Sequence, residues 1–123
     1  MESLSLKSGH QFIEVDIGEI THLEAMDNYV KIYRREKPLV ITQITMKEME
    51  RRLPADRFRR VHRSYIIALD QIEKYAHRKI FCRQPDLRIP VGRKYLPDFL
   101  DYYRSNFENP NADIKNESGQ MSL

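Results

Sequence analysis

The stretch FRRVHRSYII, residues 58–67, holds the side chains whose chemistry most needs an explanation. Its apolar residues are typical of a β-strand, yet Arg59, Arg60 and Arg63 stand among them and Arg57 precedes them. A strand needs no such charge in order to fold. A guanidinium group can donate two parallel hydrogen bonds to a phosphate or to a guanine edge. These arginines therefore favour an anionic partner, and nucleic acid is the favoured one.

The same stretch, taken as a single strand, would alternate its side chains between two faces. The two faces would carry Arg59, Val61, Arg63 and Tyr65 on one side, and Arg60, His62, Ser64 and Ile66 on the other. Burial of one face therefore cannot hide all three arginines. We expect at least one face of this strand to meet water or an anionic surface.

Positive charge is concentrated in the second half of the chain. The formal net charge is +3, made up of −3 over residues 1–50, +8 over 51–104 and −2 over 105–123. Of the 21 Lys and Arg residues, 13 are arginine, which favours bidentate recognition over mere solubility. The plain alternative is a solvated basic face, so charge favours nucleic acid without identifying it.

Length and composition exclude several classes of protein. The 123 residues are enough for one domain with a real core. The sequence has no apolar run that could span a membrane, and its N-terminus lacks the apolar segment of a signal peptide. Cys82 is the single cysteine, which excludes an internal disulfide and fits a reducing compartment. We expect a cytoplasmic protein.

Catalysis is a second class of function to weigh. His62, His77 and Cys82 are the candidate metal ligands or nucleophiles. None of them has the spacing C-x-x-C or H-x-x-x-H, and the four glycines form no phosphate-binding loop. We therefore expect no enzyme activity, no metal and no cofactor.

Alternating and apolar runs predict a mostly β domain. Strands are expected first over residues 11–17, 20–25, 28–34 and 39–44, and the last two should pair as a hairpin. Further short strands are expected over residues 58–67, 72–76, 79–83 and 87–92.

Two helices are expected between and after these strands. Thr45 as N-cap and Glu48 three residues later form the capping box T-x-x-E, and Pro54 ends that helix. Residues 96–107 place apolar side chains at helical spacing. The following residues are polar, so we expect a domain over 1–107 and a disordered tail over 108–123.

Three motifs, in this order, resemble the LytTR family of bacterial DNA-binding domains. They are DIGEITHLEAMDNYVKIY (16–33), TMKEMERRLPADRFRRVHRSYII (45–67) and IPVGRKY (89–95), and the match covers roughly residues 5 to 105. The resemblance implies a mainly β, elongated LytTR-type fold of small antiparallel sheets with one short central helix and a C-terminal helix.

The resemblance also implies a function. Members of the family are usually the output half of response regulators in two-component systems. They bind short direct repeats in promoters, and they insert loops and strand ends into successive major grooves. Base contacts are implied for Asn28, Tyr29, Arg63 and Arg93. Backbone or supporting contacts are implied for Asp27, Arg59, Arg60, His62, Ser64, Lys94 and Tyr95.

The sequence departs from the family pattern in two places. Gly92 stands where a small hydroxyl residue is frequent, so a phosphate contact from that side chain is lost. Residues 67–68 are Ile-Ala where Val-Asn is frequent, so a role of that asparagine does not transfer to this chain.

The residue types suit the implied roles. Arg63 and Arg93 can each fork onto guanine, a contact worth ~1–3 kcal/mol of discrimination. Asn28 can read adenine in the same geometry. Lys94 and the arginine pair 59–60 are better suited to phosphates, which position a protein without selecting a sequence.

Each role has an ordinary structural alternative. The two base-reading arginines could form surface ion pairs, worth only ~0–1 kcal/mol each. His62 is expected to satisfy local backbone groups or a phosphate. Residues 27–28 could be a simple turn, and Tyr29 and Tyr65 are expected to pack against the protein.

The runner-up function is a basic β-rich module that binds single-stranded nucleic acid or a protein partner. Preference for a specific duplex over single strands would separate the two functions. The chain has no room for a receiver domain, so we expect an excised output domain or a stand-alone regulator. In a longer protein, a receiver domain or a sensor kinase pathway would act on it. A homodimer on double-stranded DNA is the expected assembly.

Overall fold

The computed structural model describes residues 2–107 of the chain. Strands, short 3₁₀ helices (η) and α-helices follow in the order β1 (Ser3–Ser8), β2 (Gln11–Asp16), η1 (Ile17–Glu19), β3 (Ile20–Met26), β4 (Tyr29–Arg34), β5 (Lys37–Thr42), α1 (Met46–Arg52), β6 (Phe58–His62), β7 (Tyr65–Ala68), η2 (Leu69–Gln71), β8 (Ile72–Ala76), β9 (Lys79–Cys82), β10 (Arg88–Pro90), η3 (Arg93–Tyr95) and α2 (Leu96–Phe107). The predicted tail, residues 108–123, lies outside the described residues.

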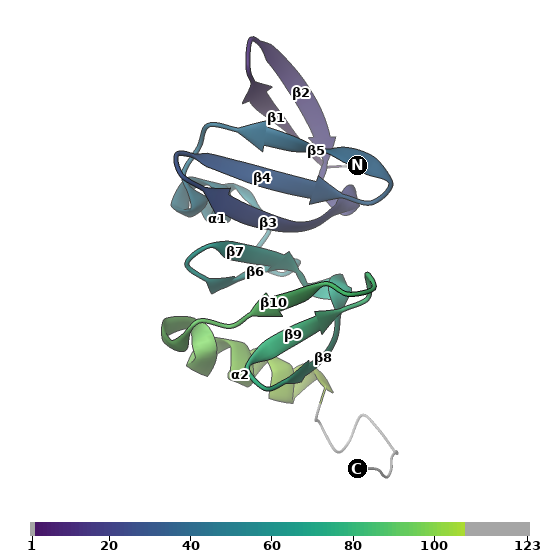
Figure 1. Ribbon diagram of the computed structural model, residues 1–123, viewed down its shortest axis with the longest axis vertical. Coiled ribbons are helices and arrows are strands. Elements are labelled where there is room, and N and C mark those ends of the chain that lie inside the picture. Colours follow the sequence, from purple (N-terminus) through teal and green to yellow (C-terminus); the bar gives the residue numbers. More distant parts are fainter. Residues whose placement is uncertain (1, 108–123) are drawn as a thin grey trace.

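The strands form three small antiparallel sheets that follow one another along the long axis of the molecule (Figure 1). The central sheet has the order β5-β4-β3-β7-β6. The β1–β2 hairpin lies beyond one end of it, and the sheet β10-β9-β8 lies beyond the other with α2. This arrangement confirms the predicted mainly β, elongated fold with a short central helix and a C-terminal helix.

The central sheet separates two hydrophobic clusters. The first lies among β1, β2, α1 and one face of the sheet, with Leu6, Leu23 and Met49 at 2% exposure or less. The second lies among β6, β7, the three-stranded sheet and α2, where Phe99 is fully buried. Strand β7 contributes to both clusters, because neighbouring side chains of a strand point to opposite faces.

Helix α1 begins and ends where the sequence predicts. The Thr45 side chain accepts a hydrogen bond from the Glu48 backbone N–H at 3.0 Å, as an N-cap does. Met46 and Met49 turn towards the first cluster and are buried. Leu53 is the C-cap, directly before Pro54. The second predicted helix, residues 96–107, is confirmed as α2.

The prediction of one strand over residues 58–67 is wrong. The chain instead forms a hairpin in which β6 and β7 pair with His62 opposite Tyr65, and Arg63 and Ser64 make the turn. The Ser64 N–H donates to His62 Nδ1 at 3.1 Å, so a side chain stabilises a turn that contains no glycine or proline. The predicted alternation of faces therefore stops at His62.

Two smaller corrections concern the first half of the chain. Strand β1 was not predicted, although its sequence SLSLKS alternates and its two leucines are buried. The strand expected over 39–44 is observed as β5, residues 37–42, with Pro38 inside it. Proline is tolerated there because β5 is the outermost strand of its sheet.

The carboxylate of Glu24 links three central strands on the face of the sheet away from the first cluster. The two carboxylate oxygens of Glu24 accept hydrogen bonds from the hydroxyls of Tyr33, at 3.3 Å, and Tyr65, at 3.2 Å. Burial, and then the charge of Glu24, raises the pKa of both tyrosines, so both remain donors at neutral pH. One carboxylate thereby ties β4 and β7 to β3.

His22 lies beside this group and is only 5% exposed. Its ring stacks on Tyr33 with centroids 4.3 Å apart, and its Nδ1 atom lies 2.9 Å from the Thr21 hydroxyl. Burial lowers the pKa of His22 from 6.5 to about 4, against the opposing charge of Glu24. The imidazole is therefore neutral in the folded protein at neutral pH.

This burial predicts that the folded protein loses stability in mild acid. Between the folded pKa of about 4 and the unfolded pKa of 6.5 the unfolded chain binds the extra proton. The contribution of His22 is fully present above pH 6.5 and is lost as the pH falls towards 4. The full effect is about 3 kcal/mol.

Urea unfolding at pH 7 and pH 4.5 of the wild type and of His22→Gln would measure this loss. The variant should lose less stability on acidification than the wild type. An identical loss in both proteins would contradict this account.

Candidate nucleic-acid interface

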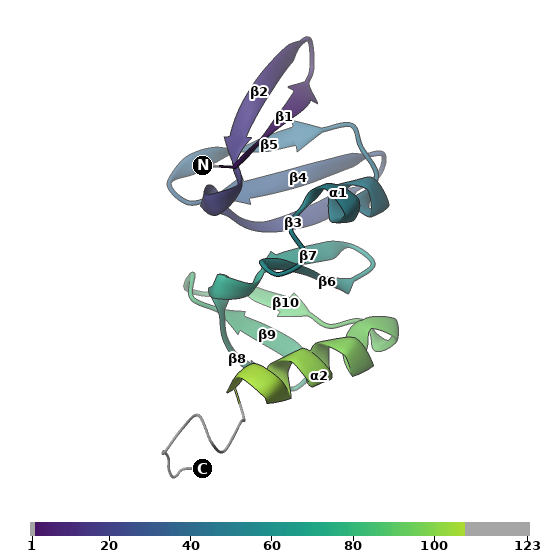
Figure 2. The same cartoon turned by 180° about the vertical axis from the view of Figure 1, so that it is seen from behind.

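The three segments to which the sequence assigns base contacts end at one edge of the molecule. They are the β3–β4 turn, the β6–β7 turn and the segment between β10 and α2, on the left in Figure 1 and on the right in Figure 2. The sheet order explains the first two, because β3 and β7 are antiparallel neighbours with Glu24 opposite Tyr65. The end of β3 and the beginning of β7 therefore meet at the same edge.

Backbone hydrogen bonds fix these segments to one another. The Ala25 N–H donates to the Ser64 carbonyl at 2.9 Å, which joins the strand of the first turn to the second turn. The Gly92 N–H donates to the Val61 carbonyl at 2.8 Å, which joins the third segment to β6. The three segments thus form one continuous unit, the reading edge, defined as residues 27–29, 62–64 and 92–95.

The first turn of the reading edge is a two-residue connection between Met26 and Tyr29. Asp27 has a φ of 54°, a left-handed conformation that aspartate tolerates. Asn28 is exposed, and Tyr29 is 42% exposed. The expectation that Tyr29 packs against the protein is therefore wrong, whereas Tyr65 is partly buried and bonded to Glu24 as expected for a packed residue.

The second turn presents Arg63 to solvent. His62 accepts from the Ser64 N–H, and its ring contacts the Tyr65 ring edge-on at 5.6 Å between centroids. The prediction that His62 satisfies a local backbone group is confirmed. The histidine and serine of this motif thus hold the turn from which Arg63 projects.

The third segment is η3, with Arg93 and Lys94 exposed and Tyr95 partly buried. Gly92 precedes it with an extended backbone, φ −71° and ψ 151°. A Cβ atom at this position would lie 3.4 Å from both His62 Cδ2 and Tyr95 Cδ2, an ordinary contact. A serine, the type of residue that the family resemblance suggests here, would therefore fit.

Arg59 and Arg60, also predicted to contact DNA, are engaged by the protein itself. They lie on opposite faces of β6, because neighbouring residues of a strand alternate. Arg59 contacts α2: its Nη1 atom is 2.7 Å from Asp98 Oδ2, and its guanidinium lies 4.8 Å from the ring centre of Tyr102. Arg60 faces α1, where its Nη1 atom is 3.5 Å from Glu50 Oε1.

Arg63 and Arg93 differ from this pair. Within residues 2–107 neither side chain makes a hydrogen bond or an ion pair with the protein, so the ion-pair alternative finds no support there. Both are exposed. Lys94 has only a cation–π contact with Tyr95, at 5.9 Å from the ring centre, within the same range. These three side chains can reach an outside partner.

The β8–β9 turn, His77 and Arg78, was missed as part of this surface. Both residues are exposed, and the Val91 N–H donates to the Arg78 carbonyl at 3.0 Å, next to the third segment. Their φ angles of 55° and 62° are unusual for residues with a side chain. The signal in the sequence was the basic pair between the strand patterns IEKYA and KIFCR.

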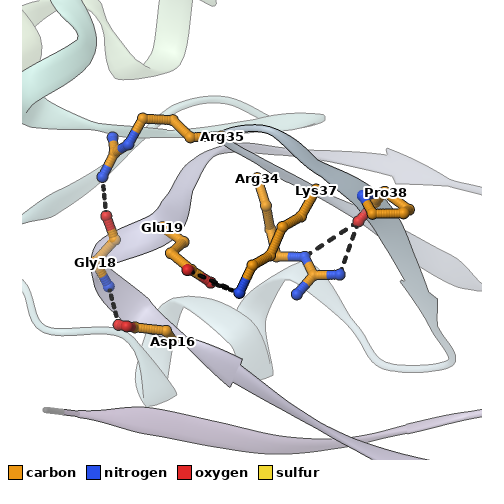
Figure 3. Close-up of polar contacts among 7 residues, drawn as sticks. All are labelled: Asp16, Gly18, Glu19, Arg34, Arg35, Lys37 and Pro38. Atoms are coloured by element: carbon orange, nitrogen blue, oxygen red, sulfur yellow. Dashed lines mark hydrogen bonds and ion pairs between the residues drawn. The ribbon is translucent and has the colours of Figure 1, made fainter.

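The opposite edge of the central sheet uses its cations differently (Figure 3). The Arg35 guanidinium donates to the Gly18 carbonyl, and Lys37 Nζ is 2.8 Å from Glu19 Oε2. Arg34 donates to a carbonyl of β5 at 2.9 Å. These contacts fasten the β4–β5 turn to η1. The cations of this edge therefore have internal partners, whereas Arg63 and Arg93 at the reading edge have none among the residues that the structure describes.

Two features of residues 2–107 bear on the candidate metal ligands and nucleophiles. Among residues 2–107 no three His, Cys, Asp or Glu side chains are grouped so that they could hold a metal ion. Burial raises the pKa of Cys82 to about 11, so its thiol stays protonated and is a poor nucleophile at neutral pH. No helix in the described range is long and apolar enough to cross a membrane.

A β domain with exposed arginines on neighbouring connecting segments, free of protein partners within residues 2–107, has features of a nucleic-acid-binding domain. The LytTr DNA-binding domain family matches residues 10–104, and the chain belongs to this family. The resemblance seen in the sequence is thereby confirmed.

Two similar proteins agree with this membership. The CO-responsive transcriptional regulator RcoM of Rhodospirillum rubrum is 35% identical over 65 residues, which cover 53% of this chain and 27% of RcoM. A solved LytTr DNA-binding domain from Bacillus cereus superimposes with a TM-score of 0.64 and 26% identity, covering 85% of this chain and 95% of that one. The chain thus corresponds to a small part of RcoM and to nearly the whole of the solved domain.

The backbone of the β8–β9 turn yields a stability prediction. Arg78→Gly should stabilise the protein by about 1 kcal/mol, because glycine adopts the left-handed region without the steric cost of a Cβ atom. Chemical unfolding would measure this gain. Lys79→Gly, one residue further and in β9, is the control and should destabilise the protein. A loss of stability in Arg78→Gly would contradict the prediction.

Proposed function

We propose that residues 1–107 are the DNA-binding domain of a bacterial transcription regulator. The domain binds specific double-stranded sequences by placing the three segments of the reading edge in successive major grooves. One observation carries this proposal: Arg63 and Arg93 are exposed, have no protein partner within residues 2–107, and lie on segments joined through the Gly92 N–H. Exposed arginines without internal partners can donate paired hydrogen bonds to the edge of a guanine.

The proposed roles follow from what each side chain contacts. Arg63 and Arg93 read guanine, Asn28 reads adenine, and the exposed ring of Tyr29 lies against the bases. Lys94, next to Arg93, and Arg78, in the adjoining β8–β9 turn, bind phosphates.

The other predicted residues support this contact surface from within. Asp27, His62 and Ser64 shape the turns, and Tyr95 supports η3. Arg59 fixes α2 to β6.

The regulatory setting belongs to the same proposal. The domain acts in the cytoplasm without enzymatic activity or a cofactor. It is controlled by an input supplied by a receiver domain, another sensory domain or a kinase pathway. Family membership and the regulator RcoM support this view. Two copies bind the two halves of a direct repeat, as a homodimer on DNA.

The test of this function is selection of bound duplexes from a random pool by the purified protein, followed by affinity measurements across a salt series. We expect a repeated short motif, and a log–log salt slope of about −0.9 per phosphate contacted. A bound pool that stays random would contradict sequence-specific binding. Equal or tighter binding of single strands would favour the runner-up function, and no binding at low salt would favour a protein partner.

The reading arginines can be tested one at a time on the selected duplex. Arg63→Ala and Arg93→Ala should each weaken binding by about 1–3 kcal/mol and relax the preference at different positions of the motif. Arg35→Ala, at the opposite edge, is the matched control and should leave the motif unchanged. Uniform weakening of all duplexes by the first two variants would show that they contact phosphates only.

Gly92 offers a gain-of-function test. Gly92→Ser should tighten binding by about 0.5–1.5 kcal/mol, because its hydroxyl can donate to a phosphate beside Arg93. The salt slope should not change, since a neutral hydroxyl releases no counterion. Gly92→Ala fills the same space without the hydroxyl and should bind as the wild type does. Equal affinities of the two variants would contradict the phosphate contact.

A further inference from the structure

Arg60 lies beside the reading edge and is bound by several elements of the protein, although the sequence assigned it to DNA. We propose that Arg60 is a positioning residue that sets the direction of Arg63 and Arg93, and that it does not bind phosphate. This inference rests on the proposed function, because it concerns how the base-reading side chains are aimed.

Arg60 holds the carbonyl groups of the second turn. Its Nη2 atom donates to the Arg63 carbonyl at 2.7 Å, and its Nε atom points to the His62 carbonyl at 3.4 Å. A two-residue turn has few internal bonds of its own, so a side chain that binds its carbonyls limits how the peptide groups can rotate. Fixing the Arg63 carbonyl fixes the backbone from which the Arg63 side chain leaves.

The same guanidinium reaches two other elements. Its Nη1 atom lies 3.5 Å from Glu50 Oε1 on α1, and its central carbon lies 5.6 Å from the ring centre of Tyr95 in η3. Arg60 therefore touches helix α1, the turn that carries Arg63 and the segment that carries Arg93. A planar group with donors in fixed directions can make all these contacts at once, which a lysine ammonium cannot.

Burial and charge separate Arg60 from a phosphate ligand. Its side chain is 18% exposed, and its charge faces the carboxylate of Glu50. It lines a groove between α1 and η3 together with Glu50, Lys94 and Tyr95. A phosphate contact would have to replace these internal bonds, whereas Lys94 in the same groove is exposed. The geometry therefore suits Arg60 to positioning the turn, whereas Lys94 is free to bind phosphate.

The first test is Arg60→Lys, which keeps the charge and removes the fork. The measured quantity is the ratio of affinity for the selected duplex to affinity for a scrambled duplex. We expect this ratio to fall about tenfold, with binding to the scrambled duplex within about twofold of wild type and the salt slope unchanged. If Arg60 were a phosphate contact, lysine would rescue it and the ratio would stay at the wild-type value, which would overturn the proposal.

The second test, Glu50→Gln, separates the two explanations, because long-range electrostatics alone leaves the affinity ratio unchanged whereas a positioning role lowers it. Removal of an acidic charge near DNA should tighten binding to every duplex if only long-range electrostatics act. If Glu50 orients Arg60, the affinity ratio should fall, by about threefold. Glu48→Gln is the matched control, because it removes the same charge from α1 at a residue that pairs with Arg51. It should leave the ratio unchanged.

Thermal unfolding of each variant separates positioning from loss of fold. If Arg60→Lys unfolds below the assay temperature, the comparison of Glu50→Gln with Glu48→Gln decides the question alone. Equal ratios for these two variants would then overturn the inference. If the wild type itself does not distinguish the two duplexes, the proposed function fails, and that outcome is distinct from failure of the positioning role.

Discussion

Burial of strand β7 on both faces is the constraint on which the rest of the structure depends. Ile66 is 1% exposed and faces the first cluster, while Ile67 is fully buried in the second. The side chains of β7 therefore belong to both clusters, and the sheet places β7 between two other strands. Its antiparallel neighbours are β3 and β6, which brings the β3–β4 and β6–β7 turns to the same edge. The reading edge is therefore a consequence of how the two cores share one strand.

The arginines of residues 58–67 serve different purposes, although they are only a few positions apart. Arg59 binds Asp98 on α2, and Arg60 binds Glu50 on α1, so each helix is attached to β6 by a cation on its own side. Exposed ion pairs contribute little to stability, and the carboxylates of both pairs are exposed, so these contacts serve mainly to fix orientation. Arg63, at the turn, has no such partner within residues 2–107. Two of these arginines thus hold helices against β6, and Arg63 remains available to an outside partner.

Structural features set by neighbouring residues could be predicted from the sequence, and contacts between residues far apart in the sequence could not. The capping box at Thr45 and Glu48 located α1, because an N-cap is satisfied within one turn of helix. The turn at Arg63 was missed because its stabilising acceptor is a histidine ring and not a glycine or proline conformation. The family resemblance pointed to three segments, and the structure brings these segments to one edge. The resemblance could not show that Arg59 and Arg60 are bound by helices, since their partners are ten to thirty-nine positions away.

The connections within the reading edge determine what kind of recognition it can perform. Separate flexible loops would lose conformational entropy when they enter a groove, which lowers affinity. Here backbone hydrogen bonds from Ala25 to Ser64 and from Gly92 to Val61 fix the spacing of the three segments in the folded protein. Most of the conformational entropy of these segments is therefore lost on folding and not on binding. Under the proposed function, the strand spacing of the sheets would set the interval between the base groups that the edge reads, and loop motion could not absorb a mismatch in that spacing. Under the same proposal, an edge held in this way suits base groups at one fixed interval and discriminates against the same groups at another interval.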